Sequence, residues 1–63
     1  MKKRVVHRVF NLDHYVTLEQ TALNRFAVVY GSQIKKDLTY EEAALEYGSC
    51  IMHSATCAGR ILP

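Results

Sequence analysis

Four side chains that could bind a metal ion or act as nucleophiles recur at helical spacing near the C-terminal end: Glu46, Cys50, His53 and Cys57. Intervals of four, three and four residues place them on one face of a helix. Thiolate and imidazole are ligands that Zn²⁺ prefers, but one helix delivers only neighbouring pairs to one ion, so further ligands must come from a second chain. Because both cysteines border an apolar arc, we interpret the cluster as packing. The sequence thus predicts no metal and no cofactor, with Cys50, His53 and Cys57 as the ligand candidates to test.

Nucleophilic catalysis needs more than a cysteine. A reactive Cys50 or Cys57 requires a base and an orienting group inside a pocket, and a core of this size encloses little volume. The chain has no glycine-rich phosphate loop, no supported pair of catalytic carboxylates and no CxxC motif. We interpret His7 and His14 as exposed or structurally paired. The sequence therefore predicts a non-enzymatic protein without catalytic residues.

The length of the chain limits its core. Residues 1–63 are 49% hydrophobic and 22% charged, which predicts a single small domain. A chain this short buries only about 60% of its unfolded surface, so a second copy is the expected supplement to the core. Two cysteines seven residues apart on one helix cannot bridge each other. With neither a signal peptide nor an apolar run of about 18 residues, the sequence predicts a cytoplasmic homodimer and no membrane contact.

Positive charge is concentrated at the N-terminus. Residues 1–10 carry four bases and no acid, whereas residues 11–63 carry four bases and six acids. The larger part of the chain is therefore not a basic platform for nucleic acid, and phosphate contacts must come from the arm. The sequence predicts that the nucleic-acid-binding residues are Lys2, Lys3, Arg4 and Arg8.

Patterning predicts a mostly α fold in which a basic arm precedes two amphipathic helices, as β-α-α or as a helical hairpin. Residues 1–12 form the arm, and β-branched and aromatic residues favour a strand within it, although a helical reading stays open. Strict alternation in that strand places Arg4, Arg8 and Phe10 on one face.

The two helices are expected over 17–36 and 39–59. A capping box begins each, at Thr17 with Gln20 and at Thr39 with Glu42. Whether the first helix continues through Gly31 is open. The apolar arcs predict core or dimer packing by Phe26, Tyr30, Ile34, Tyr40, Tyr47 and Ile51.

Two DNA-binding layouts share features with the chain. The segment Leu38–Ala44, followed by Gly48 and by Gly59-Arg60-Ile61, resembles the opening helix-turn-helix of excisionase and MerR-type domains. A strand followed by two helices also resembles the ribbon-helix-helix layout, which implies a dimeric strand pair in the major groove. Residues 51–58 contain no Arg, Lys, Gln or Asn to read bases.

Two functions follow from these patterns. The first is a dimeric nucleic-acid-binding regulator that contacts phosphates or a groove through the basic arm, with DNA as the candidate partner. The second is a protein–protein interaction module that inhibits or adapts a larger partner through a tyrosine-bearing helical surface. The basic arm favours the first, and the acidic remainder favours the second.

Overall fold

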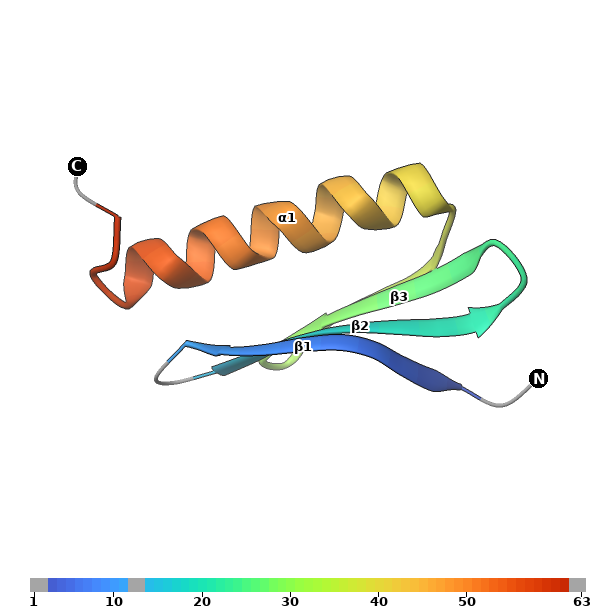
Figure 1. The fold of residues 1–63 in the computed structure, drawn as a ribbon, viewed down its shortest axis with the longest axis horizontal. Coiled ribbons are helices and arrows are strands. Elements are labelled where there is room, and N and C mark those ends of the chain that lie inside the picture. The colour runs from blue at the N-terminus through green and yellow to red at the C-terminus, as the bar shows by residue number, and fades with distance from the viewer. Residues whose placement is uncertain (1–2, 12–13, 62–63) are drawn as a thin grey trace.

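The structure, a computed structural model, describes residues 3–11 and 14–61. Four antiparallel strands in the order β1-β2-β3-β4 form one sheet, and a single helix follows. Helix α1 lies along one face of this sheet, which gives two layers (Figure 1). The elements are β1 (Arg4–Asn11), β2 (His14–Ala22), β3 (Arg25–Tyr30), β4 (Gln33–Leu38) and α1 (Tyr40–Cys57).

The expectation of a mostly α protein with two helices is wrong. Residues 17–36 form most of β2, all of β3 and part of β4 instead of a helix. Left-handed backbone at Asn24 and Gly31, with φ of 52° and 59°, turns the chain between these strands. The run Arg25–Tyr30 is rich in β-branched and aromatic residues, which pack well in a sheet. Because residues 3–11 and 14–61 contain one helix, they adopt neither the helix-turn-helix nor the ribbon-helix-helix arrangement.

The expected start of the remaining helix is confirmed. The Thr39 hydroxyl accepts from the Glu42 backbone N–H at 3.3 Å, and the Thr39 N–H donates to Glu42 Oε1 at 3.0 Å. Hydrogen bonding to the Thr39 backbone and side chain holds the pKa of Glu42 below its ordinary value. The helix ends at Cys57, and Gly59 follows with a φ of 74°.

One face of the sheet packs against α1. Cross-strand partners share a face, so His7, Leu18 and Val28 form one row across β1, β2 and β3. Leu18 of this row lines a 310 Å³ pocket beneath the small residues of α1, together with Phe26, Tyr40, Ala43, Ala44, Tyr47 and Gly48. This row therefore lies on the helix side of the sheet.

The core is small. Val16 and Val28 are the largest fully buried side chains, at 0% and 1% exposed, and Ala27 and Ala43 are also buried. Few large side chains are removed from water, so the fold depends heavily on each of them.

A β-bulge changes the faces of β1. Val5 pairs with Glu19 and His7 pairs with Leu18, which leaves Val6 as the extra residue. The pairing of Arg4 with Gln20 places Arg4 on the helix side, whereas Arg8 lies on the other side. Strict alternation is therefore interrupted, and the prediction that Arg4 shares a face with Arg8 and Phe10 is wrong.

Candidate nucleic-acid interface

The sheet surface opposite α1 is its open face. Direct pairing of Arg8 with Thr17, of Thr17 with Val29 and of Val29 with Ile34 forms a row through all four strands. The same pairing rule adds residues on either side of that row. The open face comprises Lys3, Val5, Arg8, Phe10, Tyr15, Thr17, Glu19, Thr21, Ala27, Val29, Ile34, Lys36 and Asp37.

A groove occupies the part of the open face near β4. It has a volume of about 580 Å³ and an apolar floor of Ala27, Val29 and Ile34. Its remaining lining is polar: Lys3, Glu19, Thr21, Lys36 and Asp37. Lys3 Nζ lies 3.8 Å from Glu19 Oε1, which offsets the carboxylate within the groove.

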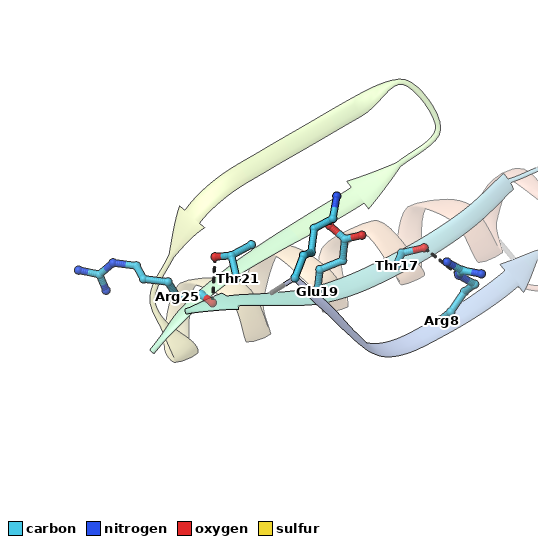
Figure 2. Close-up of polar contacts among 6 residues, drawn as sticks. Arg8, Thr17, Glu19, Thr21 and Arg25 are labelled. Atoms are coloured by element: carbon cyan, nitrogen blue, oxygen red, sulfur yellow. Dashed lines mark hydrogen bonds and ion pairs between the residues drawn. The ribbon is translucent and has the colours of Figure 1, made fainter. Parts of the chain in front are cut away.

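Arg8 and two aromatic rings lie at the other part of the open face. Arg8 Nε donates to the Thr17 hydroxyl at 3.3 Å (Figure 2). The Arg8 guanidinium carbon lies 5.3 Å from the centroid of the Tyr15 ring, a cation–π distance. Phe10 packs on Tyr15 with 4.7 Å between ring centroids, and the two residues are 50% and 54% exposed. Arg8 is thus oriented by its contacts with Thr17 and Tyr15.

The two layers carry opposite charge. Residues 3–11 and 14–38 contain six bases and two acids, a formal +4, whereas α1 contains three acids and no base, a formal −3. Glu41, Glu42 and Glu46 are the acids of α1. A polyanion is therefore attracted to the sheet layer and repelled by the helix layer.

The structure distributes the four predicted basic residues differently from the sequence pattern. Lys3 and Arg8 lie on the open face, Arg4 lies on the helix side, and Lys2 is outside the described residues. Sequence reasoning missed Lys36, which the path of the chain brings to the same face from β4. It also missed the pairing of Phe10 with Tyr15, because each ring belongs to a different strand.

The residues predicted to pack in the core or a dimer separate into two groups. Phe26, Tyr30, Tyr47 and Ile51 are half-buried, whereas Ile34 lies on the open face and Tyr40 is 70% exposed. His7 Nδ1 lies 2.6 Å from the Tyr47 hydroxyl, a hydrogen bond that joins β1 to α1. Burial raises the pKa of Tyr47. Tyr47 therefore connects the layers and is not a free surface tyrosine.

The candidate metal ligands do not gather at one point. Cys57 Sγ lies 3.7 Å from His53 Nε2, and the His53 ring packs edge-on against Tyr30. Burial, and next the Glu46 carboxylate, raise the pKa of the Cys50 thiol, which disfavours the thiolate that metals bind. Within residues 3–11 and 14–61, no group of three His, Cys, Asp or Glu side chains is placed to hold a metal ion.

Other features of the described chain add little about its role. No helix among the described residues combines the length and apolar character needed to span a membrane. The side chains of the open face are therefore the main structural evidence about function. Comparisons of the chain with protein-family models, curated proteins and solved structures found no match.

Proposed function

We propose that this protein is a non-enzymatic regulator that binds nucleic acid with the open face of its sheet. The observation that carries this proposal is the charge separation between a +4 sheet layer and a −3 helix. Three bases, Lys3, Arg8 and Lys36, lie on the face that α1 leaves uncovered. They are the residues we expect to contact phosphates.

The spacing of these bases suits an extended ligand. Arg8 belongs to β1 and Lys36 to β4, so three inter-strand intervals of roughly 4.8 Å separate their strands. The bases are therefore spread across a surface roughly 14 Å wide, which is wide enough to contact more than one phosphate. The contact surface spans the sheet and is not limited to an N-terminal arm.

Salt dependence tests the proposal. We expect the affinity for a fluorescently labelled oligonucleotide, measured by anisotropy, to fall steeply between 25 and 250 mM NaCl. Release of counterions from three phosphate contacts predicts a slope of log K against log salt of about −2 to −3. The absence of binding at the lowest salt concentration contradicts the proposal.

We propose that the protein is a homodimer that associates through the outer surface of α1, where burial of apolar side chains has to outweigh the repulsion between the three acids of each helix. Leu45 and Met52 are 77% and 59% exposed there, seven residues apart on the helix. Association on that side leaves both open faces free, because α1 and the open face lie on opposite sides of the sheet.

Sedimentation equilibrium tests this arrangement. We expect a dimer at tens of micromolar protein and a monomer for Leu45→Glu, because a carboxylate at the contact has to lose its water. The Ser32→Glu variant, an equal addition of charge in the exposed turn between β3 and β4, should remain dimeric. A monomeric wild-type protein contradicts the dimer and favours the second function, in which Tyr40, Leu45 and Met52 contact a different, larger protein.

We also propose that the protein works in the cytoplasm. Both cysteines, Cys50 and Cys57, are free thiols. Free thiols are typical of a reducing compartment, whereas small extracellular domains of this size commonly rely on disulfides.

A further inference from the structure

We propose that Phe10 and Tyr15 form a base-stacking site, so that the preferred ligand is single-stranded nucleic acid. This inference rests on the proposed function and adds the class of nucleic acid. Both rings lie on the open face, beside Arg8 and directly opposite each other on β1 and β2.

The exposure of the two rings carries the argument. Phe10 and Tyr15 are half exposed although they pack on each other at 4.7 Å, so ring surface remains available to a ligand. The faces of unpaired bases stack on aromatic side chains of an open antiparallel sheet. In a duplex, neighbouring base pairs cover those faces and leave mainly edges and phosphates in reach. The pair therefore favours a single strand over a duplex.

Arg8 connects stacking to phosphate binding. It lies two residues before Phe10 on the same strand, roughly 7 Å along β1. Among the described residues, the guanidinium pairs with no carboxylate, and its Nε bond to Thr17 fixes its direction. A base stacked on the exposed ring surface of the Phe10–Tyr15 pair thus has a cation beside it for a neighbouring phosphate.

Charge also distinguishes the possible occupants of this face. The open face carries Lys3, Arg8 and Lys36 together with Glu19 and Asp37, so a second copy docked face to face would meet the same small positive excess. A polyanion instead complements that excess. Charge complementarity therefore favours nucleic acid as the occupant.

The test compares one single-stranded oligonucleotide of 12 nucleotides and mixed sequence with the 12-base-pair duplex that contains it. Anisotropy is measured for the wild type, Phe10→Ala and Tyr15→Ala. Loss of one stacked base should weaken single-strand binding about 5- to 150-fold, with little change for the duplex. Tyr15→Phe should retain wild-type affinity because the ring remains.

Tyr40→Ala is the matched control, because Tyr40 is an exposed tyrosine at the start of α1 in the other layer. It should bind the single strand as the wild type does. Circular dichroism melting of every variant separates loss of binding from loss of folding. If Tyr15→Ala does not fold, Tyr15→Leu takes its place. Leucine keeps apolar bulk without a ring, so this variant should also weaken single-strand binding.

Three results overturn the inference. Equal affinity of the wild type for single strand and duplex contradicts the inferred preference for single-stranded nucleic acid. Single-strand binding that survives both alanine substitutions removes the stacking role while leaving the proposed function intact, provided that salt dependence persists. Failure of the wild type to bind either oligonucleotide at 25 mM NaCl removes the proposed function as well and indicates a protein partner.

Discussion

Val28→Asp should leave the protein largely unfolded at 25 °C. Val28 is 1% exposed and lies on the helix side of β3 between Leu18 and Lys35. Removing its side chain from the core costs about 1.5–3 kcal/mol of burial, and burying the aspartate adds several kcal/mol, of which an ion pair with Lys35 recovers only part. A chain of this length has a free energy of unfolding of only roughly 3–9 kcal/mol. Far-ultraviolet circular dichroism and urea titration measure the outcome.

The matched control is Val6→Asp, the same substitution at the bulge of β1, where Val6 is 48% exposed. We expect it to lower the free energy of unfolding by less than about 1 kcal/mol, because the carboxylate stays in water. A cooperative transition of Val28→Asp close to that of the wild type would show that the core lies elsewhere.

Local sequence signals were enough to predict the helix. Thr39 and Glu42 supply both bonds of the capping box, and each bond joins residues only three apart. Gly59 supplies the left-handed backbone beyond the other end. Because these bonds join residues that are close in the sequence, a local pattern is enough to predict them, and the predicted start of the helix agrees with the structure.

The sheet depends on pairing between distant residues, which local patterns do not reveal. Thr17 and Gln20 have the spacing of a capping box, yet both lie within β2 and face opposite sides of the sheet. The apolar residues of 17–36 fit a helical arc as well as they fit three strands separated by turns. Gly31-Ser32, directly after the β-rich run Arg25–Tyr30, is the hairpin signal that could have distinguished them.

The candidate site was predictable only in part. Composition near the N-terminus identified Lys3 and Arg8 as basic residues of interest. The bulge at Val6, which separates Arg8 from Arg4, has no clear signature in the sequence. The contribution of Lys36 required the order of all four strands, because β4 reaches the open face only through β3.

Charge reversal on the open face should abolish nucleic-acid binding. The double variant Arg8→Glu/Lys36→Glu replaces two bases of that face with acids and changes the net charge from +2 to −2. Loss of two phosphate contacts, together with repulsion of the remaining phosphates, should weaken binding on the order of 100-fold or more at low salt.

The control variant, Arg4→Glu/Lys35→Glu, makes the same change in net charge on the other side of the sheet. Arg4 pairs with Gln20 and Lys35 pairs with Val28, both on the helix side. Both double variants substitute an exposed arginine of β1 and an exposed lysine of β4, so they differ mainly in the location of the charge.

Anisotropy of one labelled single-stranded oligonucleotide at 25 mM NaCl, measured with the wild type and both double variants, tests the role of the open face most directly. We predict that Arg8→Glu/Lys36→Glu loses binding while Arg4→Glu/Lys35→Glu stays within roughly tenfold of the wild type, because charges on the other side of the sheet act only through the screened field. Equal loss in the two variants, with both shown to be folded, would contradict a specific role for the open face.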